Sequence, residues 1–185
     1  MLIDITLEIT PTIAAEAKLK QKPELEGHLG THFDVMNKAF PLSYTKRQGV
    51  VFDVSSVRER DITAADIDMN AVKKDMFVAF YTGFIEEEPY GTRRYFAEHP
   101  QLADTLIDTL VERGVSIIAL DCAGVRRGKE HTPKDRYCAE HGVFVVENLA
   151  NLKVVLQRGG KFTAHTYPMH FTGLTGLPCR VIAEV

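Results

Sequence analysis

The apolar stretches of this sequence are short and rich in β-branched and aromatic residues, which limits the folds open to the chain. Runs of four to six such residues between turn residues predict buried β-strands, and they are far too short to span a bilayer. The clearest runs are 49–54 (GVVFDV), 76–81 (MFVAFY), 115–120 (VSIIAL) and 143–146 (VFVV). Further strands are expected at residues 2–6, 161–169 and 180–185.

Helical signals are fewer than strand signals. Residues 100–113 carry apolar side chains at helical spacing, and Gly114 follows as a helix-ending residue. A short helix is expected at 137–140, before the next apolar run. Because strands outnumber helices and two of them follow helices directly, the pattern predicts one α/β domain over residues 1–185 with a central mixed sheet.

Charge and cysteine usage exclude several classes of protein. The chain has 22 basic and 25 acidic residues, a net charge of -3, so it lacks the basic surplus of a nucleic-acid binder. The first residues show no basic region followed by an apolar stretch, so we expect no secretory signal. Three widely spaced cysteines argue against a disulfide framework. We therefore expect a cytoplasmic protein whose partner is a small molecule, with no nucleic acid and no membrane.

Histidine and acidic side chains cluster in residues 27–34 (GHLGTHFD). In an extended chain His28, His32 and Asp34 share one face with Gly30, which adds no bulk between them. Two imidazoles and a carboxylate suit zinc and, less specifically, manganese or iron. The alternative is that the histidines lie in a solvated loop and Asp34 caps a turn.

A second acidic signal stands far along the chain. Glu147 closes the apolar run 143–146, and a carboxylate at the end of a buried strand is costly unless it is paired or bound to a metal. The alternative is that Glu147 simply emerges into water. Asp121, which closes the run 115–120, has the same character with less support.

These residues resemble a known family. His28 to Asp34 matches the first seven positions of the signature His-x-Gly-Thr-His-x-Asp-x-Pro-x-His of the cyclase-type metal-dependent hydrolases, which include bacterial kynurenine formamidase. The resemblance implies a swivelling β/β/α (cyclase-like) fold, a homodimer or homotetramer, and hydrolysis of small amides, lactams or lactones. Further ordered matches lie at 3–6 (IDIT), 82–84 (TGF), 142–152 (GVFVVENLANL) and 176–183 (GLPCRVIA).

The resemblance also implies a ligand set for one or two ions per chain, Zn²⁺ or Mn²⁺. By position, the first ion takes His28, His32, Asp34 and Glu147, and the two carboxylates also bridge to a second ion. The family's remaining second-site histidine is Asp135 in this chain. His131, one helical turn earlier, is an alternative ligand.

Two other signature positions differ from the family. Its proline is Met36, and its final histidine, the general acid/base, is Lys38. A lysine is protonated at neutral pH unless burial or a metal lowers its pKa, so it suits proton donation or oxyanion binding better than base catalysis. Asp34, or Asp135 if it does not bind the metal, is then the candidate to accept a proton from water. The alternative for Lys38 is a solvated surface position.

The segment Thr82, Gly83 and Phe84 is expected to line the substrate pocket, with a core position as the alternative for Phe84. His99 is expected to be an exposed helix N-cap. The basic pair Arg126 and Arg127 is read as a solvated loop, and binding of a substrate carboxylate is its alternative. The pair Arg93 and Arg94 is balanced by acidic neighbours.

Two functions follow from these expectations. The first is a metal-dependent hydrolase of a small amide, lactam or ester, with arylformamidase-like chemistry at a carbon–nitrogen bond. The second is a metal-binding small-ligand protein of the same fold without hydrolytic activity, which the changes at Lys38 and Asp135 motivate. A lyase that uses Lys38 in a new role is a third interpretation.

Overall fold

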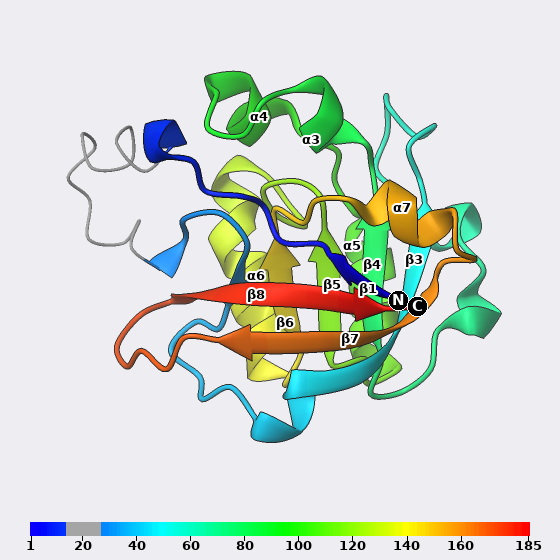
Figure 1. The fold of residues 1–185 in the computed structure, drawn as a ribbon. Coiled ribbons are helices and arrows are strands. Elements are labelled where there is room, and N and C mark those ends of the chain that lie inside the picture. The colour runs from blue at the N-terminus through cyan, green and yellow to red at the C-terminus, as the bar shows by residue number, and fades with distance from the viewer. Residues whose placement is uncertain (14–26) are drawn as a thin grey trace.

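A closed ring of β-strands forms the centre of the computed structural model, which describes residues 1–13 and 27–185 (Figure 1). Strand β8 (Gly176–Glu184) closes the ring because it pairs with β7 on one side and with β2 on the other. The ring runs β8, β2 (His32–Asp34), β6 (Phe144–Glu147), β5 (Ile117–Leu120), β4 (Phe77–Tyr81), β3 (Lys46–Asp53) and β7 (Lys161–Pro168). A further strand, β1 (Leu2–Asp4), pairs with the end of β8.

The sheet is mixed, as expected. The neighbours β3, β4, β5 and β6 run parallel, and the remaining pairs are antiparallel. Helices cover the outside of the parallel strands, with α3 and α4 above the sheet and α5 and α6 behind it in Figure 1. The helices are α3 (Phe84–Glu87), α4 (Arg93–Glu98), α5 (Asp104–Glu112), α6 (His131–Glu140) and α7 (Leu152–Leu156). Short 3₁₀ turns are η1 (Leu42–Thr45), η2 (Ala64–Asp66), η3 (Met69–Ala71) and η4 (Gly128–Glu130).

Alternation along the strands divides the core into two layers. One cluster fills the ring and includes Phe33 of β2 and Val146 of β6, which pair directly. The other lies between the sheet and helices α3–α6, and it includes Val145. Because successive side chains of a strand point to opposite faces, the neighbours of Phe33 and Val146 face outward, toward the helices.

The expected strands are confirmed, with shifts of their ends. The helix expected at 100–113 is α5 (Asp104–Glu112), and Gly114 follows it with a φ of +67°. The helix expected at 137–140 is longer than predicted, because α6 begins at His131. Its first turns are polar and carry no apolar periodicity that would have indicated this start. The last strand begins at Gly176 rather than at residue 180. The three cysteines are free and buried, and no helix of the described part of the chain could cross a membrane.

One aromatic side chain packs across the seam between β3 and β7. Phe162 of β7 is opposite Gly49 of β3, where an added Cβ would lie 2.5 Å from the Phe162 ring. That ring packs edge-on against Phe77, with centroids 5.6 Å apart. Glycine at position 49 therefore lets an aromatic ring cross the seam between β3 and β7.

We expect Phe162→Ala to lower the free energy of unfolding by about 3 kcal/mol, because it leaves a cavity at this buried seam. The exposed Phe171 provides the matched control, and Phe171→Ala should change stability by about 0.5 kcal/mol or less. Denaturant unfolding of the three proteins measures both values. Equal losses in the two variants would show that the seam is not a point of tight packing.

Candidate metal centre

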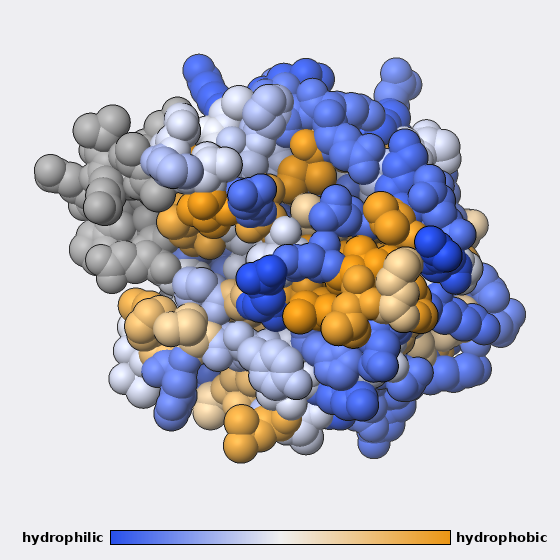
Figure 2. Space-filling view, in the orientation of Figure 1, coloured by the Kyte–Doolittle hydropathy of each residue, from blue (hydrophilic) through white to orange (hydrophobic). Residues whose placement is uncertain are grey.

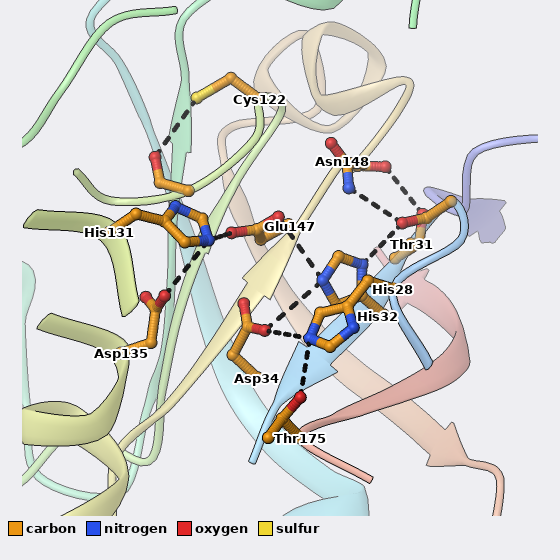
Figure 3. A network of polar contacts seen from close by, with 12 residues as sticks. His28, Thr31, His32, Asp34, Cys122, His131, Asp135, Glu147, Asn148 and Thr175 are labelled. Carbon is orange, nitrogen blue, oxygen red and sulfur yellow. Dashed lines mark hydrogen bonds and ion pairs between the residues drawn. The ribbon is translucent and has the colours of Figure 1, made fainter. Parts of the chain in front are cut away.

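The outward-facing side chains of β2 and β6 bring imidazole and carboxylate groups together (Figure 3). His32 is the direct partner of Glu147 across the two strands, and Asp34 is two residues further along the same face of β2. The Nε2 atom of His32 lies 3.6 Å from Asp34 Oδ1 and 3.5 Å from Glu147 Oε2. The sheet register itself therefore joins two parts of the sequence more than a hundred residues apart.

His28 reaches this point by a different route from the one expected. The prediction that residues 28–34 are extended is wrong for the first half of this segment. Gly30 has a φ of +68° and turns the chain before β2 begins. His28 Nε2 nevertheless lies 3.2 Å from Asp34 Oδ1. A close backbone approach permits this, since a Cβ at Gly176 would lie 2.6 Å from the Gly27 oxygen and 2.7 Å from His28 Nε2.

A second group of ligand-type atoms lies beside the first. His131 and Asp135 are one turn apart on α6, and His131 Nε2 is 3.4 Å from Asp135 Oδ2 and 3.6 Å from Glu147 Oε1. The two carboxylate oxygens of Glu147 thus face different histidines, His32 and His131. The two alternatives for the second position, Asp135 and His131, prove to be neighbours in one group. A Cβ at Gly124 would lie 2.6 Å from His131 Nδ1, so this loop packs tightly on the group.

Backbone carbonyls fix the orientation of two imidazoles. His32 Nδ1 is 2.9 Å from the Gly30 oxygen, and His131 Nδ1 is 3.1 Å from the Arg126 oxygen. A carbonyl oxygen only accepts, so each Nδ1 carries a proton, and Nε2 is the ring atom that faces the carboxylates. This is the arrangement that metal-binding histidines usually show.

Asn148, which follows β6, forms hydrogen bonds with the residues that precede β2. Its Nδ2 donates to the same Gly30 oxygen at 2.9 Å, and its Oδ1 accepts from the Tyr95 hydroxyl at 2.8 Å. The Thr31 hydroxyl donates to the backbone oxygen of Asn148 at 2.7 Å. Asn148 directly follows Glu147 and has a φ of +59°. It therefore holds the carbonyl that orients His32, a role for which the sequence offered no signal.

The carboxylates of the cluster are buried and lack hydrogen-bond partners. Both oxygens of Asp34 and of Asp135, with Glu147 Oε1 and His32 Nε2, have no partner among the described residues. Burial and the nearby Asp34 raise the pKa of both Asp135 and Glu147 well above their usual values. Burial acts in the same direction on Asp34, but the imidazoles of His32 and His28 outweigh it and hold its pKa below the usual range.

The geometry fits divalent cations. Two ligand atoms about 2.0–2.1 Å from a tetrahedral ion are roughly 3.3 Å apart, and the nitrogen–oxygen distances in both groups are 3.2–3.6 Å. The groups are His28–His32–Asp34 and His131–Asp135–Glu147, each with its ligand atoms within 4.8 Å of one another. Mixed imidazole and carboxylate ligands suit Zn²⁺ or Mn²⁺, and an ion would satisfy the unpaired oxygens.

Lys38 does not join the cluster described above. Met36 and Asn37 have φ values of +47° and +65°, and the turn that they make places Lys38 at the surface, with its N–H donating to the Val35 oxygen. Lys38 lines a cavity of about 570 Å³ between residues 35–45 and 167–177, and none of the six ligand-type residues lines it. Exposed apolar side chains gather over η1 and the β7–β8 connection on this side, including Leu42 and Met169 (Figure 2).

The segment 82–84 is engaged inside the fold. The backbone N–H groups of Thr82 and Gly83 and the Thr82 hydroxyl all donate to the buried Asp121 carboxylate, whose pKa burial raises to about 6. Phe84 belongs to the outer core layer and stacks on Tyr95. Asp121 is therefore the anchor of this turn, and substrate binding by Thr82, Gly83 and Phe84 stays a prediction.

Two other expectations are wrong. His99 is buried and follows the last residue of α4, so it ends a helix instead of beginning one. Arg126 is also buried, because it bonds Asp61, Glu130 and the Leu102 oxygen, and does not lie in a solvated loop. Arg126 is held in part by the distant Asp61 and the Leu102 oxygen, whereas His99 bonds the oxygen of the adjacent Pro100.

We expect Asn148→Ala to weaken Zn²⁺ binding about 10- to 100-fold, since the carbonyl that orients His32 loses its second hydrogen bond. Asn151→Ala is the control, because Asn151 also has a positive φ and donates to a carbonyl, that of Asp4, but lies outside the cluster. Competition with a chromogenic chelator measures both affinities. If the two variants bind Zn²⁺ equally well, Asn148 has no such role.

Comparison with known proteins places this architecture. The Cyclase family model matches residues 3–127. A solved structure described as a potential metal-dependent hydrolase with cyclase activity is 23% identical with a TM-score of 0.78, over 99% of this chain and 96% of that one. A predicted metal-dependent hydrolase from Bacillus stearothermophilus is 22% identical with a TM-score of 0.76, over 99% and 97%.

Isatin hydrolase A from Labrenzia aggregata, bound to benzyl benzoate, is 18% identical with a TM-score of 0.75, over 99% of this chain and 93% of that one. No curated protein matches the chain. The structural likenesses confirm the expected cyclase-like fold. The family match covers well over half of the sequence, and the chain therefore belongs to the Cyclase family.

Proposed function

We propose that the protein is a metal-dependent hydrolase of a small amide, lactam or ester, with Zn²⁺ or Mn²⁺ held by the two ligand groups. The observation that carries this proposal is a set of three buried carboxylates interleaved with three imidazoles, in which five of the six carboxylate oxygens lack a hydrogen-bond partner among the described residues. Similar folds are described as metal-dependent hydrolases, and one of them as an isatin hydrolase. Those descriptions belong to the other proteins and support the proposal only through the shared family and fold.

The division of the ligands follows the geometry. His28, His32 and Asp34 hold one ion, and His131, Asp135 and Glu147 hold the other, with Glu147 turned toward both. A bound divalent ion lowers the pKa of a water molecule toward about 7 and polarises a carbonyl group. The carbonyl-held His32 and His131 keep their Nε2 atoms fixed for this purpose, so little reorganisation is needed.

The cluster is accessible to solvent at two of its histidines, His28 and His131. The side chains of His28 and His131 are 24% and 31% exposed, whereas His32, Asp34, Asp135 and Glu147 are nearly or fully buried. A substrate therefore approaches from the side of His28 and His131. Asp34 remains the candidate to accept a proton from water, since Asp135 is assigned as a ligand of the second ion.

The position of Lys38 favours a second candidate function. An exposed lysine that lines a separate cavity is poorly placed to act as acid or base at the cluster. A metal-binding small-ligand protein without hydrolytic activity would need no group there. Catalysis distinguishes the two candidates, because both predict the same bound ions.

We expect the Zn²⁺- or Mn²⁺-loaded protein to hydrolyse at least one member of a panel of aryl formamides, lactams and aryl esters. His32→Ala should lower that rate about 100-fold or more, because it removes a fully buried ligand. His141→Ala, at an exposed histidine outside the cluster, is the control and should retain the rate. Two bound ions without any turnover would support the binding protein instead.

Metal affinity should fall as pH falls. Burial and the nearby Asp34 raise the pKa values of Asp135 and Glu147, which favours their protonated forms in the metal-free protein, and an ion must displace any proton held there. For each proton released, the Kd should rise about tenfold per pH unit of acidification. Zn²⁺ titrations at pH 6, 7 and 8 measure this slope, and a Kd that does not change with pH would contradict the protonated state of these groups.

A further inference from the structure

The sequence has two pairs of adjacent arginines, Arg93–Arg94 and Arg126–Arg127, and in each pair one arginine is ion-paired while the other is not, within the part of the chain that the structure describes. Arg94 is ion-paired with Glu88 and Glu98, each at 3.1 Å. Arg126 is ion-paired with Asp61 at 2.6 Å and with Glu130 at 2.5 Å. Their sequence neighbours, Arg93 and Arg127, form no ion pair with any carboxylate of the described residues.

The two arginines without ion pairs line the same pocket. Its volume is about 710 Å³, and one wall is a face of α4 that carries Arg93, Phe96 and Ala97. The opposite wall is the segment from Arg127 to Glu130. Gln101 joins the walls, because its Oε1 accepts the Arg127 N–H at 2.7 Å.

The pocket carries a net positive charge. Its one acidic residue, Glu130, has its carboxylate engaged by Arg126, with Nε–Oε2 and Nη2–Oε2 distances of 3.0 and 2.5 Å. With Arg93 and Arg127 against Glu130, the residues that line the pocket carry one net positive charge. Planar guanidinium groups match a carboxylate in geometry and charge, and the half-exposed ring of Phe96 offers an apolar wall beside them.

The pocket shares a loop with the second ligand group, although none of the six ligand-type residues lines it. Residues 124–131 contribute to both, since the Arg126 oxygen orients His131 and Gly124 packs on its ring, while Arg127 and Glu130 line the pocket. Glu130 directly precedes His131, the more exposed ligand-type residue of that group.

We propose that this pocket, through Arg93 and Arg127, binds the carboxylate of a small aromatic acid that is a substrate or product of the neighbouring metal centre. The link to catalysis rests on the proposed hydrolase function. In such a hydrolysis, the hydroxyl of water joins the carbonyl carbon, the bond to nitrogen or oxygen breaks, and the leaving atom takes the remaining proton. Every amide, lactam or ester turned over thus yields a carboxylate, and a substrate that carries one of its own would use the same arginines.

Benzoate is the probe, with benzamide as its neutral counterpart and inorganic phosphate as a general anion. Calorimetric titration of the full-length, Zn²⁺-loaded protein should give benzoate binding that weakens about tenfold in Arg93→Gln and in Arg127→Gln, since each removes a charge-assisted hydrogen bond. Arg94→Gln, the neighbouring arginine whose charge is already paired, should leave the benzoate Kd within about twofold of wild type. Zn²⁺ content should be equal in all four proteins.

Benzoate binding that is unchanged in both pocket variants and disappears when the ions are chelated would overturn the proposal, because the probe would then sit on the metals alone. Phosphate or benzamide binding as tight as that of benzoate would also overturn it.

If the variants lose benzoate binding while no tested amide or ester is hydrolysed, the pocket stands and the hydrolase function fails. With an active substrate, a KM raised in Arg127→Gln only for substrates bearing a carboxylate supports the pocket as a substrate site. Weaker inhibition by benzoate alone supports it as a product site.

Discussion

Three buried carboxylates within reach of one another are the constraint around which this structure is organised. Asp34, Asp135 and Glu147 repel each other when ionised, and five of their six oxygens find no hydrogen-bond partner among the described residues. Burying such groups is costly unless a positive charge compensates them. Three imidazoles supply nitrogen ligands and partial compensation, and divalent cations would supply the rest.

The fold delivers these groups with ordinary devices. The antiparallel pairing of β2 with β6 sets His32 opposite Glu147, and alternation places both on the helix-covered face. The first turns of α6 add His131 and Asp135 at the spacing that puts two residues on one side of a helix. Because Gly124 and Gly176 lack a side chain, their backbone can lie directly against the imidazoles of His131 and His28.

Much of this could be read from the sequence because it is local. The apolar runs predict the strands, and the position of Glu147 at the end of such a run indicates that its carboxylate has a partner or a ligand. His28, His32 and Asp34 converge as expected, although a turn at Gly30 and not a continuous strand brings them together. The contacts of Arg126 with Asp61 and of Asn148 with the Gly30 oxygen escaped prediction because they join distant parts of the chain. The start of α6 was missed because its first turns are polar, and the burial of His99 has no signal in its neighbouring residues. The homodimer or homotetramer and the cytoplasmic location stay predictions.

The placement of two ions tests the central claim most directly. Diffraction data from crystals of the Zn²⁺-loaded protein, collected on both sides of the zinc absorption edge, locate each ion by its anomalous signal. The account predicts two peaks per chain, each about 2.0–2.2 Å from nitrogen and oxygen atoms of its own group, with the Glu147 carboxylate between them. Anomalous density elsewhere on the surface, with none in the cluster, would contradict it.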